Sequence, residues 1–124
     1  MNKARILIVE DNKNMREILN KILVNIGFNN VTGVENGKLA WEKIQQAQFD
    51  LVISDLMMPE MNGFELLKQI RNSNNYIKDL PVIITTASHE VADINEALKW
   101  KVNSYLTKPY SVKTVVAKIK EIFG

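Results

Sequence analysis

The stretch Ile6-Leu7-Ile8-Val9-Glu10-Asp11 begins with an aliphatic, mostly β-branched run and ends in two acidic residues. The run is too short for a helix, and its composition is typical of a strand buried on both faces. Short apolar runs bounded by polar or turn residues recur along the chain, most weakly at residues 31–34. The predicted strands lie at residues 6–9, 31–34, 51–53, 82–84 and 105–106.

Segments with apolar residues at helical spacing separate these strands and follow the last one. They lie within residues 15–26, 39–47, 64–70, 91–98 and 112–122, and Ser111 is the expected N-cap of the last. Strict alternation of strand and helix indicates a parallel sheet, because each right-handed crossover needs a covering helix. The sequence therefore predicts an α/β fold with a doubly wound, five-stranded parallel sheet and helices on both faces.

Composition narrows the possible classes of protein. A length of 124 residues without an evident linker predicts one domain, residues 1–124. The chain has no cysteine, which excludes disulfides and thiolate sites and fits a reducing compartment, so we expect a cytoplasmic protein with no membrane span. The net charge is only +2, so we expect no nucleic-acid binding by this chain alone.

Polar residues that suit phosphoryl transfer follow the predicted strands. Glu10 and Asp11 follow the first, Asp55 the third, Thr86 the fourth and Lys108 the fifth. In doubly wound sheets the functional crevice lies at the carboxyl ends of the strands. Clustered carboxylates suit a hard cation such as Mg²⁺, and a lysine in the same crevice pairs with an acid or with a phosphoryl group.

The sequence resembles response regulator receiver domains, including the CheY-like single-domain type. The resemblance rests on residues 6–11, on residues 54–63 (Ser-Asp-Leu-Met-Met-Pro-Glu-Met-Asn-Gly), on Thr86-Ala87 and on Lys108-Pro109. Their order and their places at strand ends make the resemblance specific, and it spans nearly the whole chain. It implies the flavodoxin-like (βα)5 fold with strand order 2-1-3-4-5.

The resemblance also implies roles for four residues around the acceptor. Asp55 matches the phosphoacceptor, Asp11 the direct Mg²⁺ ligand, and Glu10 a neighbour that acts through water. Met57 matches the position that gives its backbone carbonyl to the metal. The side chain at this position can assist or obstruct the hydrolytic water, and the apolar Met57 is expected to offer no polar help.

Three further positions match the family's switch. Thr86 matches the hydroxyl that binds a phosphoryl oxygen, with Thr85 as the neighbouring candidate, and Lys108 matches the cation that contacts another oxygen. Tyr105 matches the aromatic residue that moves inward with the threonine; the alternative is a structural tyrosine. The bond between Lys108 and Pro109 is expected to be cis.

The implied function is that of a phosphoacceptor in two-component signalling, without turnover of a separate substrate. The expected donor is a histidine kinase or a histidine phosphotransfer protein. The expected target is a protein that binds the face of the fourth helix, fifth strand and fifth helix. Whether the chain is a stand-alone receiver or part of a longer regulator stays open.

Three other functions are less consistent with the sequence. An aspartyl-phosphate phosphohydrolase needs an aspartate at the position of Met57. A nucleotide or flavin module needs a glycine-rich loop after the first strand, where residues 10–13 are Glu-Asp-Asn-Lys. A receiver-like domain that no longer accepts phosphate is disfavoured by the full set of Asp11, Asp55, Thr86 and Lys108.

The segment before the fifth strand departs from the family pattern. Lys101 and Val102 stand where receivers usually have Gly-Ala, so we expect an unusual surface near the fourth helix. Trp100 is expected to serve packing or partner contact, and His89 to lie in an exposed loop. The lysines of the C-terminal third form either a solvated face or a docking surface for an acidic partner; they are Lys99, Lys101, Lys113, Lys118 and Lys120.

Overall fold

The computed structural model describes residues 3–58, 61–87 and 91–124, and over these it contains a five-stranded parallel sheet in the order β2-β1-β3-β4-β5. The predicted fold class and strand order are confirmed. His89, Pro59 and Glu60 lie outside the described residues. The strands are β1 (Arg5–Val9), β2 (Asn30–Val34), β3 (Leu51–Asp55), β4 (Val82–Thr86) and β5 (Ser104–Thr107).

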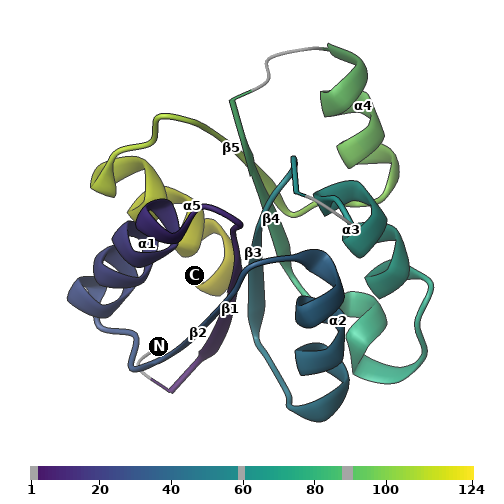
Figure 1. Cartoon of the computed structure of the whole chain (residues 1–124), viewed down its shortest axis with the longest axis horizontal. Coiled ribbons are helices and arrows are strands. Elements are labelled where there is room, and N and C mark those ends of the chain that lie inside the picture. Colours follow the sequence, from purple (N-terminus) through teal and green to yellow (C-terminus); the bar gives the residue numbers. More distant parts are fainter. Residues whose placement is uncertain (1–2, 59–60, 88–90) are drawn as a thin grey trace.

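The helices cover both faces of the sheet, with α1 and α5 on one face and α2, α3 and α4 on the other (Figure 1). Successive strand residues point to opposite faces. Ile6 and Ile8 of β1 accordingly pack with α1 and α5, and Leu7 and Val9 with α2 and α3. The helices are α1 (Lys13–Ile26), α2 (Gly37–Gln46), α3 (Gly63–Arg71), the 3-10 helix η1 (Asn75–Asp79), α4 (Val91–Lys99) and α5 (Val112–Phe123).

Side-chain caps fix where several helices begin. The predicted N-cap of α5 is confirmed, because the Ser111 hydroxyl accepts a hydrogen bond from the backbone N–H of Thr114 at 3.2 Å. Asn62 and Glu65 form a reciprocal capping box at the start of α3. The short helix η1 has no counterpart among the predicted elements, because a single turn contains no repeat of apolar residues.

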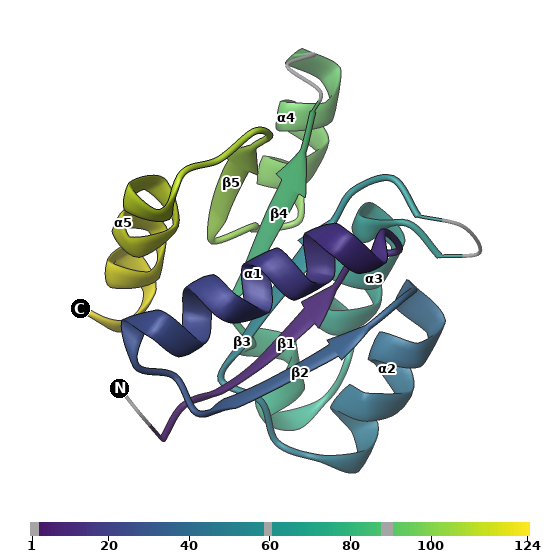
Figure 2. The same ribbon diagram turned by 60° about the vertical axis from the view of Figure 1, so that its left-hand side comes forward.

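The register of the sheet brings the strand ends to one edge. Val9 of β1 pairs with Ser54 of β3, Asp55 with Thr85 of β4, and Thr86 with Thr107 of β5. The strand arrows in Figure 2 point toward this edge. β3 and β4 run two residues further than predicted, because their polar ends continue the ladder. The predicted crevice therefore lies at the carboxyl ends of β1 and β3, beside the point where the winding direction of the sheet reverses.

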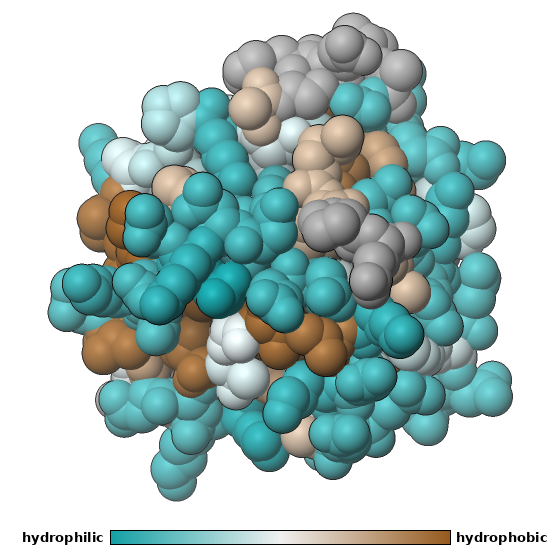
Figure 3. Space-filling model, viewed as in Figure 1, coloured by the Kyte–Doolittle hydropathy of each residue, from teal (hydrophilic) through white to brown (hydrophobic). Residues whose placement is uncertain are grey.

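The surface visible in Figure 3 is mostly hydrophilic, and its hydrophobic side chains form small separate groups. Among the described residues, no helix has the length and hydropathy needed to cross a membrane. The large hydrophobic side chains that are exposed come from several elements: Ile18, Val24, Leu39, Met57, Tyr76, Leu98 and Val112.

The turn after α4 places Lys101 in a left-handed backbone conformation, with φ of 58°. Its N–H donates to the carbonyl of Leu98 at 3.0 Å, and the N–H of Val102 donates to that of Ala97 at 3.1 Å. This pair of hydrogen bonds is a Schellman motif, which usually has glycine at this position because a Cβ is crowded there. The departure at Lys101 therefore carries a conformational cost.

We predict that Lys101→Gly raises the free energy of unfolding by about 0.5–1 kcal/mol, because glycine adopts this conformation without the crowding of a Cβ. Urea denaturation followed by circular dichroism measures the change. Lys99→Gly, within the last turn of α4, is the control and should lower stability by up to about 1 kcal/mol. A Lys101→Gly protein no more stable than wild type would contradict the prediction.

Candidate functional site

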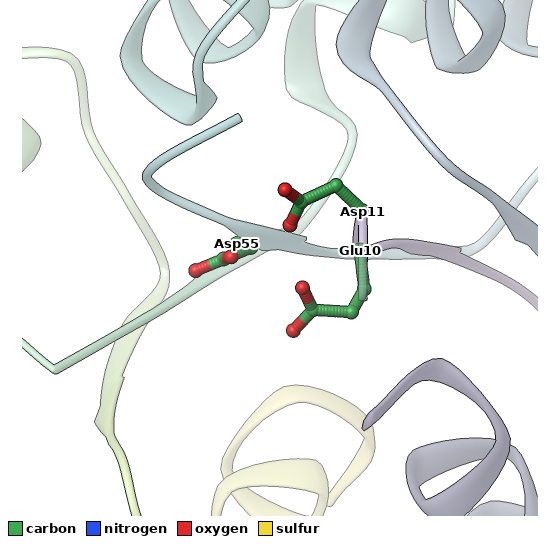
Figure 4. Close-up of side chains that lie close together, drawn as sticks. All are labelled: Glu10, Asp11 and Asp55. Carbon is green, nitrogen blue, oxygen red and sulfur yellow. The ribbon is translucent and has the colours of Figure 1, made fainter. Parts of the chain in front are cut away.

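Three carboxylates meet at the carboxyl edge of the sheet. Glu10 and Asp11 follow β1, and Asp55 ends β3. One oxygen from each lies within 4.8 Å of the others, and the three groups point into the same space (Figure 4). We call these residues the acidic cluster. Glu10 and Asp55 are buried, with 4% and 7% of their surface exposed, whereas Asp11 is exposed and open to an incoming ion.

The ammonium group of Lys108 lies against the acidic cluster. Its Nζ is 2.8 Å from Oε1 of Glu10 and 3.4 Å from Oδ1 of Asp55. The residue follows β5, and its backbone N–H donates to the carbonyl of Thr86 at 2.7 Å. The bond between Lys108 and Pro109 is cis, as expected. One cation is thus shared by two of the three carboxylates.

Burial and neighbouring charges shift the pKa values of Glu10 and Lys108. Burial raises the pKa of the Glu10 carboxyl, and the charge of Asp55 raises it further, although hydrogen bonds from Lys108 and the Asn12 backbone oppose the rise. Burial alone would lower the pKa of the Lys108 ammonium, but its hydrogen bond to Glu10 and the charges of Asp55 and Glu10 raise it overall. The site therefore holds its lysine proton firmly and disfavours the charge on Glu10.

The donor set of the acidic cluster fits a hard divalent cation. Carboxylate oxygens are preferred by Mg²⁺, and a cation relieves the repulsion between carboxylates held this close. Lys108 offsets only part of the negative charge. The geometry at the Met57 carbonyl and the water-mediated role of Glu10 stay predictions.

Arg16 of α1 holds the backbone of Glu10 in place by a hydrogen bond. One of its guanidinium nitrogens donates to the Glu10 carbonyl at 2.8 Å. Its side chain crosses Gly33 of β2 so closely that a Cβ there would lie 3.1 Å from Arg16 Cγ and Cδ. This contact was not predicted, because Arg16 contributes to neither an apolar stripe nor a strand end.

The loop after Asp55 is held close to the sheet. The Leu56 N–H donates to Asp55 Oδ1 at 2.9 Å, which fixes one oxygen of the carboxylate. The Gly63 N–H donates to the Leu56 carbonyl, and a Cβ at Gly63 would lie only 2.6 Å from the Asp55 carbonyl. Gly63 therefore permits α3 to begin against the end of β3.

The two switch candidates lie on neighbouring strands, Thr86 at the end of β4 and Tyr105 in β5. Thr86 is 2% exposed, and Tyr105 is half-buried against the core on the α2 and α3 side. Burial raises the pKa of the Tyr105 hydroxyl, the charge of Asp93 adds to the rise, and the nearby Thr86 hydroxyl opposes it. The Tyr105 hydroxyl is buried and forms no hydrogen bond with any described residue.

Comparison with known proteins points to one family. The sequence model of the response regulator receiver domain matches residues 6–120. Chemotaxis protein CheY1 of Helicobacter pylori is 36% identical over 97% of each chain, and chemotaxis protein CheY-3 of Vibrio cholerae is 39% identical over 96% of this chain and 91% of the relative.

Solved structures give the same result. The chemotaxis response regulator CheY4 of Vibrio cholerae has a TM-score of 0.88 and 29% identity over 97% of this chain and 98% of that one. The signal receiver domain of a signal transduction histidine kinase from Syntrophus aciditrophicus has a TM-score of 0.87 and 30% identity over 96% of this chain and 89% of that one.

We predict that Glu10→Gln raises the free energy of unfolding of the metal-free protein at pH 7, because burial and the charge of Asp55 disfavour the ionised carboxylate. A carboxyl whose pKa is raised by folding contributes most stability below its unfolded pKa and loses that contribution as pH rises through the folded value. Glutamine stays neutral throughout. The advantage of the variant should therefore shrink as pH falls through the raised pKa of folded Glu10, and it should be lost below the ordinary value of 4.5.

Chemical denaturation in EDTA at pH 7 and pH 4 measures this effect. Glu42→Gln, at an exposed position on α2, is the control and should change stability little at either pH. If Glu10→Gln is less stable than wild type at pH 7, the hydrogen bond with Lys108 outweighs the cost of the buried charge, contrary to our expectation.

Proposed function

The chain belongs to the response regulator receiver family, whose CheY-like members are phosphoacceptors in two-component signalling, and we propose that Asp55 is the acceptor here. One observation carries the proposal: Asp55 converges with Glu10, Asp11 and Lys108 at the carboxyl edge of the sheet. Leu56 fixes one oxygen of Asp55, so the carboxylate is oriented before a donor arrives.

In the proposed reaction, a carboxylate oxygen of Asp55 attacks phosphorus in the donor. When the donor is a phosphohistidine, the phosphorus–nitrogen bond breaks as the new phosphorus–oxygen bond forms, and the leaving imidazole takes up a proton. The product is an acyl phosphate on Asp55. Lys108, now shared between Glu10 and Asp55, turns to the transferred group and stabilises its negative charge.

The acidic cluster is the proposed Mg²⁺ site. Asp11 and Asp55 would bind the ion directly, Glu10 would act through water, and Met57 would contribute its backbone carbonyl. The ion, when bound, neutralises charge on the phosphoryl oxygens. The Met57 side chain is 72% exposed and offers no polar group to the water that hydrolyses the product.

The proposed switch connects Asp55 to the opposite side of β4 and β5. The Thr86 hydroxyl moves to a phosphoryl oxygen, and Tyr105 fills the space that the threonine leaves. Two observations support this order of events: Thr86 is buried and Tyr105 is half-buried on neighbouring strands, and no described residue ties the Tyr105 hydroxyl to its present position by a hydrogen bond. Motion of the ring then changes the surface of α4, β5 and α5.

We propose that a partner protein binds the surface formed by α4, β5 and α5. Leu98 of α4 is 63% exposed and Val112 of α5 is 55% exposed, so the helices on either side of β5 present apolar contacts. The relatives are chemotaxis proteins, and by analogy the donor is a histidine kinase or a histidine phosphotransfer protein and the compartment is the cytoplasm. No separate substrate is turned over, and no nucleic acid or membrane is bound by this chain.

Phosphorylation by acetyl phosphate tests the acceptor. We expect wild type to gain one phosphoryl group by intact-mass spectrometry with Mg²⁺ and little or none in EDTA. Asp55→Asn should gain none, because an amide oxygen is a poor nucleophile. Asp79→Asn, an exposed position at the opposite edge of the sheet, should behave as wild type. Equal phosphorylation of the Asp55→Asn protein would mean that the acceptor is another residue.

A further inference from the structure

A pocket of about 540 Å³ lies at the edge of the sheet opposite the acidic cluster. It is formed by the end of α3, by η1 before β4, and by the turn that joins α4 to β5. Its main lining side chains are Arg71, Lys78, Asp79, Lys99, Trp100 and Lys101, which we call the basic pocket. None of these residues takes part in the proposed phosphoryl transfer.

The basic pocket has an excess of positive charge. Four of the named side chains are cations and Asp79 is the one carboxylate. Lys78, Lys99 and Lys101 are exposed, and none of them forms a salt bridge with a described residue. An anion that enters the pocket therefore meets three lysines that form no salt bridge with a described carboxylate.

Arg71 gives the pocket a fixed positive charge. Its guanidinium group donates four hydrogen bonds, and every acceptor is a neutral oxygen rather than a carboxylate. The side chain is therefore held rigidly, and none of these hydrogen bonds pairs its charge with a carboxylate, although the nearby Asp79 attracts it electrostatically. The acceptors are the carbonyls of Lys78, Leu80 and Lys101, at 3.1, 2.6 and 2.9 Å, and Oδ1 of Asn103 at 2.9 Å.

Trp100 forms a rigid apolar wall. Its indole N–H donates to Glu96 at 3.3 Å, and the ammonium of Lys68 lies 5.5 Å from the ring centroid. Lys68 also pairs with Glu96 at 3.2 Å, so the ring is fixed by side chains from α3 and α4. Tryptophan and arginine in such settings are frequent anchors of protein interfaces.

Lys101 adds charge at a structural cost. It occupies the left-handed position of the Schellman motif, with φ of 58°, where glycine is less strained. The family that this chain resembles usually has glycine there. A lysine at this position puts a cation at the basic pocket that glycine would not provide.

We propose that the basic pocket binds a carboxylate-rich segment of a partner protein. The cations complement spaced carboxylates, Trp100 offers an apolar contact, and Asp79 can accept backbone N–H groups of a peptide. A compact polyphosphate or a nucleic acid suits the pocket less well, because Asp79 repels dense negative charge. The pocket lies at the opposite edge from Asp55, so binding does not depend on phosphorylation.

A synthetic peptide with alternating glutamate and leucine residues tests the proposal, with ¹⁵N-labelled full chain observed by NMR. We expect saturable shifts of the Trp100 indole signal and of the Lys101 backbone amide, with little change at the Trp41 indole. A matched peptide with glutamine in place of glutamate should cause no shift. Binding should weaken as salt is raised.

Charge variants distinguish binding in the basic pocket from nonspecific electrostatic attraction to lysines elsewhere on the protein. Lys101→Gly and Lys78→Gln should each weaken binding by about threefold, although the first variant is expected to be more stable than wild type. Lys120→Gln, an exposed lysine of α5, removes the same charge away from the pocket and should leave the affinity unchanged.

Three outcomes would overturn the proposal. The first is no shift at Trp100 with the acidic peptide, and the second is equal weakening by Lys120→Gln. The third is a shift at Trp100 caused by pyrophosphate or a short oligonucleotide but not by the peptide, which would assign the pocket to a phosphate-bearing ligand instead.

Discussion

The repulsion among three carboxylates at one edge of the sheet is the constraint on which the rest of the site depends. The parallel topology makes it unavoidable, because β1 and β3 are neighbours and their polar residues follow at the same edge. Lys108 approaches two of the carboxylates but supplies one charge. The site is therefore prepared for a further cation and sensitive to an added phosphoryl group. Both properties belong to a phosphoacceptor.

Much of this arrangement could be predicted from short local patterns. The aliphatic run at residues 6–9 predicts a strand buried on both faces, and all four of its residues are at most 1% exposed. Because strand and helix alternate, the parallel sheet follows, and with it the meeting of Glu10, Asp11, Asp55 and Lys108. Glu10 and Asp11 are adjacent, but Asp55 and Lys108 are far from them and from each other in sequence, and the topology brings all four together.

Other features depend on contacts that no periodicity reveals. Arg16 holds the Glu10 carbonyl because Gly33 leaves space for its side chain, a relation between two elements that carry no shared motif. Arg71 binds carbonyls of Lys78 and Lys101, which only the folded chain brings close. The departure at Lys101 is visible in the sequence, but its left-handed backbone and its place in a basic pocket are not.

The two ends of the sheet thus have different charge and different roles. At the carboxyl edge, three carboxylates concentrate negative charge, and Lys108 forms salt bridges with two of them. At the amino edge, positive charge surrounds Trp100 at the end of α4. α4 lies between them and is next to β5, the strand that carries Tyr105. The proposed switch and the basic pocket therefore involve opposite ends of the sheet.

The most direct measurement is ¹⁹F NMR of beryllofluoride, a phosphoryl mimic, in the presence of the protein. If Mg²⁺ and the phosphoryl group share the site at Asp55, a bound fluoride signal should appear for wild type with Mg²⁺. It should be absent in EDTA and absent for Asp55→Asn with Mg²⁺. A bound signal of equal intensity without Mg²⁺, or with Asp55→Asn, would contradict a metal-dependent acceptor at this position.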